Sequence, residues 1–208
     1  MTEIVQVDSQ RPEPERIARA AALIRAGEVV GIPTDTVYGL ASDAFNGAAA
    51  EKVFALKQRA ATAPLLLLVN SMEMARSCAA SLPEMFVRLA EKFWPGPLTI
   101  VVPASPRIPA QVTAGLGTVG IRFPQSPIAL ALIAAAGVPI TASSANRSRQ
   151  PECRSAEDVK EAIGGGLKLI LDGGASGAGA ASTVVSVVDG TVKVLREGAI
   201  PAKAISDF

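Results

Sequence analysis

Histidine is absent from this 208-residue sequence, and its absence restricts the possible chemistry more than any other feature of the composition. Without histidine the chain cannot form a Ser-His-Asp or Cys-His catalytic arrangement, and it lacks the commonest general base. Any reaction must use carboxylates, lysine, arginine, hydroxyls, backbone amides or a loosely held metal. The sequence also contains neither a Walker A motif nor a GxGxxG motif after a strand, which excludes the two commonest phosphate-binding loops.

Cysteine, aromatic residues and long apolar runs are also scarce. The two cysteines, Cys78 and Cys153, fit no CxxC or zinc-site spacing, which suits a reducing cytosol. Aromatic residues make up only 4 % of the chain, so the core must consist of Ala, Val, Leu and Ile. The longest apolar runs, such as 128–136, are too short to cross a bilayer, and the first ten residues do not resemble a signal peptide. We therefore expect a cytoplasmic protein with no membrane partner.

The residues that are present predict an α/β fold. Apolar residues make up 49 % and charged residues 19 %, which is typical of a globular chain, and the formal net charge of +1 gives no global attraction to nucleic acid. Helical spacing alternates with short apolar runs along the whole chain. Helices are predicted over 12–26, 48–57, from 71, 83–94, 127–137 and from 155 to 164. Strands are predicted over 29–32, 65–69, 98–102, 118–123, 138–141 and 167–171, and Asp189-Gly190 predicts a hairpin between 182–188 and 191–196. This pattern favours one domain over 1–208, built around a twisted mixed β-sheet with flanking helices.

The segment 33–40, PTDTVYGL, is the densest polar cluster next to a predicted strand. Pro33 cannot donate to a sheet ladder, so the strand should end there. Three hydroxyls and one carboxylate follow within five residues, and such groups are costly beside a buried strand unless they bind a ligand or pair with one another. The alternative is a hydroxyl-rich turn that satisfies its own backbone.

Four further segments contain groups that bind anions or nucleotides. They are Lys57-Gln58-Arg59 at a helix end, Arg122 within an apolar strand, 141–146 (TASSAN) after a buried strand, and the pair formed by Ser182-Thr183 and Arg196-Glu197-Gly198. A Lys and Arg pair can clamp polyphosphate, and Ser and Asn can bind phosphate, ribose or adenine. Taken singly, these segments can be explained as solvated cations, a surface arginine, a polar turn and ordinary strand ends.

In this order the segments resemble the signatures of the YrdC-like family, the L-threonylcarbamoyladenylate synthases, in its short form. The family's Lys-x-Arg pair is followed here by Pro64-Leu65, and its WPGPLT segment stands at 94–99, where we assign it to the fold as a rigid turn. Its SAN motif is matched by 144–146. The chain departs from the family at Ala60, where many relatives have Pro, at Leu68, where many have His, and at Arg149, where Gly is usual.

The resemblance implies a nucleotidyltransferase that makes threonylcarbamoyl-AMP and pyrophosphate from L-threonine, bicarbonate and ATP, with Mg²⁺ as cofactor, for tRNA modification. Its implied partners are a possible tRNA contact and downstream threonylcarbamoyl transferase proteins. The implied catalytic residues are Lys57 and Arg59. ATP would contact Lys57, Arg59, Ser144, Asn146 and Arg196, and threonine would contact Thr34, Arg122, Ser144 and Ser182.

Two other functions are compatible with the sequence. A related enzyme could form a carbamoyl-adenylate from carbamoyl phosphate, and dependence on carbamoyl phosphate in place of threonine would favour it. A non-catalytic module could bind structured RNA through a local basic face, and strong, salt-sensitive RNA binding without nucleotide turnover would favour that.

Overall fold

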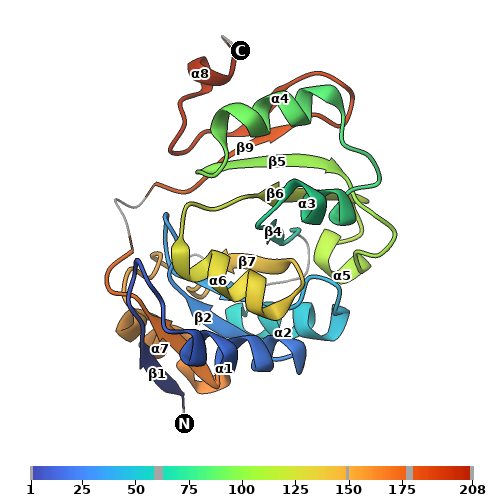
Figure 1. Ribbon diagram of the computed structural model, residues 1–208. Helices are drawn as coiled ribbons and strands as arrows, with labels where there is room; N and C mark the ends of the chain where they lie inside the picture. The colour runs from blue at the N-terminus through green and yellow to red at the C-terminus, as the bar shows by residue number, and fades with distance from the viewer. Residues whose placement is uncertain (1, 59–62, 149, 177–179, 207–208) are drawn as a thin grey trace.

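A computed structural model describes residues 2–58, 63–148, 150–176 and 180–206 (Figure 1). Within this part of the chain, ten strands form one mixed sheet in the order β1-β8-β2-β3-β7-β4-β6-β5-β9-β10. The strands are β1 (Glu3–Gln6), β2 (Val30–Ile32), β3 (Gly39–Ala41), β4 (Leu66–Leu68), β5 (Leu98–Pro103), β6 (Thr118–Arg122), β7 (Ile140–Ser144), β8 (Leu169–Asp172), β9 (Thr183–Ser186) and β10 (Lys193–Arg196). The helices are α1 (Pro14–Arg25), α2 (Gly47–Lys57), α3 (Met72–Cys78), α4 (Glu84–Phe93), α5 (Ala110–Thr113), α6 (Pro127–Ala136), α7 (Ala156–Ile163) and α8 (Ala202–Ser206), and a 3₁₀ turn, η1 (Gly164–Gly166), follows α7. The predicted α/β class with a mixed sheet and flanking helices is confirmed.

Local capping explains several helix boundaries. The Ser126 side chain accepts from the backbone N–H of Ala129 at the start of α6, and Gly137 ends that helix at φ +72°, a conformation that glycine adopts without strain. Ser155 and Asp158 form a reciprocal capping box at the start of α7, the helix that the sequence predicts from 155 to 164. The predicted hairpin is present as the antiparallel pair β9 and β10.

Two strands were not anticipated from the sequence. β1 pairs parallel with β8, and β3 pairs antiparallel with both β2 and β7. β3 contains the last part of the PTDTVYGL segment, which therefore turns back into the sheet instead of remaining a loop. Three residues show no usable periodicity, so only the pairing with β2 and β7 identifies β3 as a strand. The short helices α5 and α8 were also unforeseen.

Side chains alternate along the central strands, so one face of these strands packs into the main hydrophobic core and the other face points away from it. Leu67, Ile100, Ile121 and Val185 belong to the main hydrophobic core, and each is fully buried. Helices α3 and α4 contact β6 and β5 respectively, and Figure 1 shows α4 lying along β5 and β9. Because side chains alternate across a strand, the residues on either side of these four point to the opposite face.

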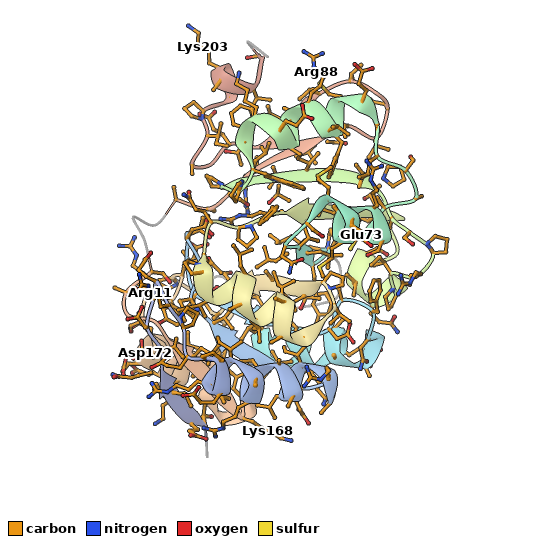
Figure 2. All side chains as sticks on the ribbon, viewed as in Figure 1. Arg11, Glu73, Arg88, Lys168, Asp172 and Lys203 are labelled. Atoms are coloured by element: carbon orange, nitrogen blue, oxygen red, sulfur yellow. The ribbon has the colours of Figure 1, made fainter. Side chains whose placement is uncertain are left out.

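Helices α1 and α6 pack against each other on the other half of the sheet, where a second apolar cluster includes β2 and β8. Charged side chains project from the outline of the molecule, as Arg88, Lys168 and Lys203 do in Figure 2. Over the residues that the structure describes, no helix has the length and apolarity needed to cross a membrane.

Candidate active site

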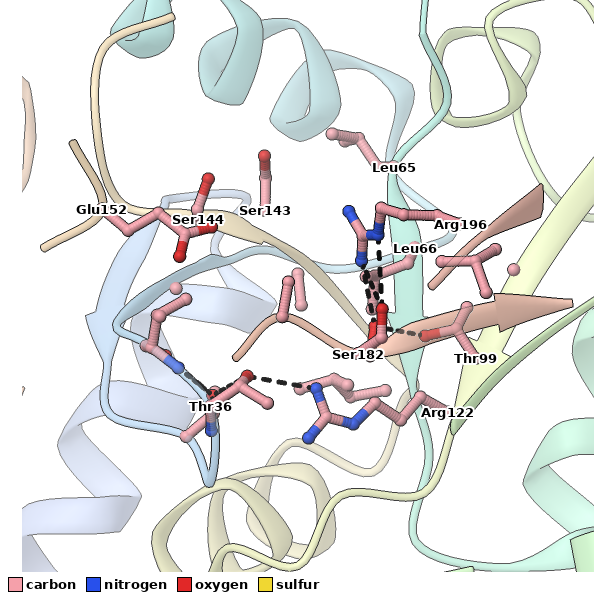
Figure 3. A pocket seen from close by; sticks show the side chains of 18 of the residues that line it. Thr36, Leu65, Leu66, Thr99, Arg122, Ser143, Ser144, Glu152, Ser182 and Arg196 are labelled. Atoms are coloured by element: carbon pink, nitrogen blue, oxygen red, sulfur yellow. Dashed lines mark hydrogen bonds between the residues drawn. The ribbon is translucent and has the colours of Figure 1, made fainter. Parts of the chain in front are cut away.

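A cavity of about 290 Å³ lies on the face of the central strands opposite the main hydrophobic core (Figure 3). It gathers residues from segments that are far apart in the sequence. Five of the predicted site residues line it, namely Thr34, Arg122, Ser144, Ser182 and Arg196. The structure thus brings all four predicted threonine contacts together with two of the five predicted ATP contacts, Ser144 and Arg196.

The floor of the cavity is formed by alternate residues of the sheet. In the antiparallel register of β5 with β6, Val101 lies opposite Gly120, and β6 pairs on its other side with β4, where Arg122 lies opposite Leu68. Val101, Gly120, Arg122 and Leu68 all line the cavity. The floor is therefore apolar apart from Arg122 and the hydroxyl of Thr99, and it is held by continuous strand pairing.

The PTDTVYGL segment forms one wall and satisfies much of its own backbone. Thr34 Oγ1 donates to the carbonyl of Val37 at 2.7 Å and accepts from the N–H groups of Thr36 and Val37 at 3.2 and 3.3 Å. The Tyr38 hydroxyl donates to the carbonyl of Gly174 at 2.8 Å, and burial raises the pKa of this phenol. The segment is therefore both a turn that satisfies its own backbone and a wall of the cavity.

Arg122 is held in a fixed orientation by three different groups. Its Nε donates to the carbonyl of Gly96 at 3.0 Å, Nη1 donates to Thr36 Oγ1 at 3.2 Å, and Nη2 pairs with Asp35 Oδ2 at 2.6 Å. The side chain is only 5 % exposed. Burial lowers the pKa of Arg122, the charge of Asp35 opposes that shift, and the like charge of Arg196 adds to it. An arginine nevertheless stays charged in proteins, so the cavity contains a buried cation paired with the Asp35 carboxylate.

Arg196 lies across the floor from Arg122 and is joined to Ser182 (Figure 3). Its Nη2 donates to the Ser182 carbonyl at 2.8 Å and lies 3.3 Å from Ser182 Oγ. Ser182 Oγ lies 2.9 Å from Thr99 Oγ1. Two guanidinium groups and a chain of hydroxyls thus face one small space, which suits a ligand with anionic oxygens.

Lys57 and Asn146 do not line this cavity, but they shape the loop beside it. Lys57 is 3 % exposed, and its Nζ donates to the carbonyls of Ser144 and Asn146, the latter at 2.8 Å. The Asn146 amide donates to the carbonyl of Gln150 at 2.6 Å. The buried lysine is therefore not a solvated surface cation, because it fixes the loop that presents Ser144. Arg59, like Ala60 and Arg149, lies outside the described residues.

The profile of the family described as "Telomere recombination" (Sua5_yciO_yrdC) matches residues 22–198. This chain belongs to the Sua5/YciO/YrdC family. It is 41 % identical over 205 residues to a threonylcarbamoyl-AMP synthase of Pyrococcus abyssi, covering 99 % of this chain and 60 % of that protein. It is 42 % identical over 191 residues to the Bacillus subtilis protein of the same name, covering 91 % of this chain and 55 % of that one.

The fold agrees with the same assignment. The crystal structure of P. abyssi Sua5 complexed with L-threonine superposes with a TM-score of 0.95 at 40 % identity, covering 99 % of this chain and 60 % of that one. The chain therefore spans little more than half the length of these relatives. The resemblance to the YrdC-like family predicted from the sequence is confirmed.

Several residues of this Sua5/YciO/YrdC site were not predicted. Thr99 belongs to the WPGPLT segment, which the sequence assigned to the fold, yet it lines the cavity, and the Gly96 carbonyl of the same segment holds Arg122. Glu152 also lines the cavity without having been singled out. The signal for Thr99 was available, because it lies one residue from the buried Leu98 and Ile100 and must face the other side of β5.

Proposed function

We propose that this chain is an L-threonylcarbamoyladenylate synthase, forming threonylcarbamoyl-AMP and pyrophosphate from L-threonine, bicarbonate and ATP. The observation that carries the proposal is the cavity in which Arg122, Arg196 and Ser182 converge. Its support comes from the 40 % identical P. abyssi Sua5, whose structure was solved with L-threonine. Two fixed cations and several hydroxyls suit an amino acid and a nucleotide that both present anionic oxygens.

The reaction needs alignment and charge neutralisation more than a covalent nucleophile, which agrees with a chain that has no histidine. The threonine nitrogen bonds to the carbon of carbon dioxide from bicarbonate and loses a proton. An oxygen of this carbamate then bonds to the α-phosphorus of ATP while the bond to the β-phosphate breaks, releasing pyrophosphate. Arg122 would bind the threonine carboxylate, and Thr34, Ser144 and Ser182 would orient the amino acid.

The nucleotide would lie between Arg196 and the loop 144–146. Arg196 would neutralise phosphate oxygens, while Ser144 and Asn146 would fix the nucleotide. Lys57 would act here by holding the carbonyls of this loop, and Arg59 would supply a further cation to the polyphosphate. We therefore propose that catalysis depends on both residues, on Lys57 through the loop and on Arg59 through the polyphosphate.

Mg²⁺ would reach the site with ATP. Across 2–58, 63–148, 150–176 and 180–206 there is no group of three or more His, Cys, Asp or Glu side chains that could hold a metal ion. Phosphate oxygens would therefore supply most of the magnesium ligands, and Glu152, which lines the cavity, would supply a carboxylate. When bound, the ion neutralises charge on the phosphates.

Threonylcarbamoyl-AMP would be consumed by a transferase that carries the threonylcarbamoyl group to adenosine in tRNA. The partners we propose are therefore those downstream transferase proteins, with a possible direct tRNA contact, and the cytoplasm as the place of reaction. Near-neutral net charge gives no general attraction to RNA, so any such contact must be local.

Pyrophosphate release from ATP and Mg²⁺ tests the proposal, with threonine and bicarbonate omitted in turn. We expect release only when both are present. Release that depends on carbamoyl phosphate instead would identify a different carbamoyl-adenylate enzyme. No release together with strong, salt-sensitive binding to structured RNA would identify a binding module.

A further inference from the structure

Thr99 is a buried hydroxyl on the cavity floor whose role follows from its neighbours. It is 2 % exposed, and its Oγ1 lies 2.9 Å from Ser182 Oγ, which is itself almost fully buried. Arg196 Nη2 approaches the same serine oxygen at 3.3 Å. Ser182 Oγ is thus the meeting point of two side chains, one of which can only donate.

The donors and acceptors can be counted. A serine hydroxyl has one hydrogen to donate and two lone pairs that accept. Arg196 has no lone pair to offer, so it occupies one acceptor position of Ser182 Oγ. When Thr99 donates as well, both acceptor positions are filled and the serine hydrogen is left to point at a ligand. A hydrogen directed into the cavity suits an anionic oxygen.

Gly120 gives the Thr99 side chain the room that this orientation requires. A Cβ atom built at Gly120 would lie 2.9 Å from Thr99 Cγ2 and 3.7 Å from Val101 Cγ2. The first distance is shorter than real Cβ contacts allow. The methyl of Thr99 therefore occupies space that any other residue at 120 would fill, and its χ1 rotamer directs Oγ1 towards Ser182. A glycine inside a strand otherwise weakens the strand.

We propose that Gly120 and Thr99 act together as positioning residues for substrate recognition. Gly120 leaves room for the Thr99 methyl, Thr99 Oγ1 donates to Ser182 Oγ, and the Ser182 hydroxyl thereby donates to an oxygen of the bound amino acid. This inference rests on the proposed function, because the ligand is L-threonine. Neither residue bonds to a reacting atom, so both control the KM and Kd for threonine and leave kcat and the KM for ATP nearly unchanged.

The first test compares Thr99→Val with Thr99→Ser. Valine keeps the shape and both branches but loses the hydroxyl, so we expect the KM and the calorimetric Kd for threonine to rise about tenfold. Serine keeps the hydroxyl, and we expect both values within about twofold of those of the unmodified protein. Thr113→Val is the matched control, because Thr113 is also buried and its Oγ1 bonds to the Ala110 carbonyl of its own helix. It should change neither value.

The second test is specific to the pair. Gly120→Ala should raise the threonine KM about tenfold, because the new Cβ displaces the Thr99 methyl. The double change Gly120→Ala with Thr99→Ser should restore binding, because serine has no Cγ2. Thermal unfolding shows whether each variant is folded. If Gly120→Ala does not fold, the comparison of Thr99→Val with Thr99→Ser still tests the inference.

The outcomes separate this inference from the proposed function. If the unmodified protein neither binds threonine nor releases pyrophosphate with it, the proposed function is wrong and this inference falls with it. If the unmodified protein binds threonine and Thr99→Val binds it equally well, the inference alone is wrong. If Thr99→Ser does not restore binding to Gly120→Ala, the added methyl acts on the ligand directly and the coupling of the two residues is refuted.

Discussion

Replacing Asp35 by Asn tests how much of this architecture depends on a single buried ion pair. Asp35 Oδ2 lies 2.6 Å from Arg122 Nη2, and the two side chains are 15 % and 5 % exposed. Removing one partner of a buried pair costs about 3–5 kcal/mol, because the remaining charge is uncompensated. Asparagine keeps one acceptor for Arg122, so we expect a loss of about 3 kcal/mol in the free energy of unfolding.

Urea denaturation and thermal unfolding measure this loss. In a chain of this size, a loss of about 3 kcal/mol corresponds to a decrease in Tm of about 6–12 °C. The matched control is Glu3→Gln, which breaks the ion pair between Glu3 and Arg19. The two charged atoms lie 2.7 Å apart, and the side chains of Glu3 and Arg19 are 52 % and 55 % exposed. This control should change the free energy of unfolding by no more than about 0.5 kcal/mol, because exposed pairs contribute little.

A double change isolates the electrostatic cause. Asp35→Asn combined with Arg122→Met removes the uncompensated cation, so the double variant should be less destabilised than the sum of the single variants by at least about 1.5 kcal/mol. Asp35→Asn within about 0.5 kcal/mol of the unmodified protein would refute the reasoning. Strict additivity in the double variant would refute it as well.

Three further predictions follow from buried or capping groups. Burial raises the pKa of both Cys78 and Cys153 to about 11. Both thiols should therefore resist labelling by a thiol reagent at pH 8 until the protein unfolds, and rapid labelling of the native protein would contradict this. Because an unfolded thiol ionises first, with a pKa near 9.0, the free energy of unfolding should decrease as the pH rises from 9 towards 11. Lys57→Met keeps the aliphatic stem but removes the Nζ that donates to two loop carbonyls. We expect the free energy of unfolding, measured by urea denaturation, to fall by about 2 kcal/mol, and we expect the turnover of the folded variant to fall as well. Unchanged values in both assays would exclude Lys57 from loop support and catalysis. Ser155→Ala removes the capping box of α7 and should cost about 1 kcal/mol, measurable by thermal unfolding against a neutral exposed substitution.

Much of the fold is encoded in local patterns that can be read from the sequence. Ser126 and Gly137 bracket α6 as capping rules predict, and Asp189-Gly190 closes the hairpin. These features depend on residues within a few positions of one another. β3 was not predicted, since its three residues become a strand only by pairing with β2 and β7.

The chemical identity of the site residues could also be predicted, but their geometry could not. Residue type and motif order are enough to identify Arg122, Ser182 and Arg196 as candidates. Strand alternation could have shown which side of β5 Thr99 faces, but nothing local reveals that β5 and β9 pair in parallel and bring its hydroxyl to Ser182. The burial of Lys57 behind the loop 144–146 likewise results from packing between distant segments.

The sequence alone determined most of the element types, the absence of histidine chemistry and the set of polar side chains available for a reaction. Periodicity, capping and turn chemistry act over a few residues, so they can be recognised in the sequence. The tertiary structure decided which of those side chains face one another, since strand register depends on contacts between distant segments and the Asp35–Arg122 pair joins residues 87 positions apart. The room that Gly120 leaves for Thr99 is decided in the same way, by two neighbouring strands of a sheet whose pairing no local pattern specifies.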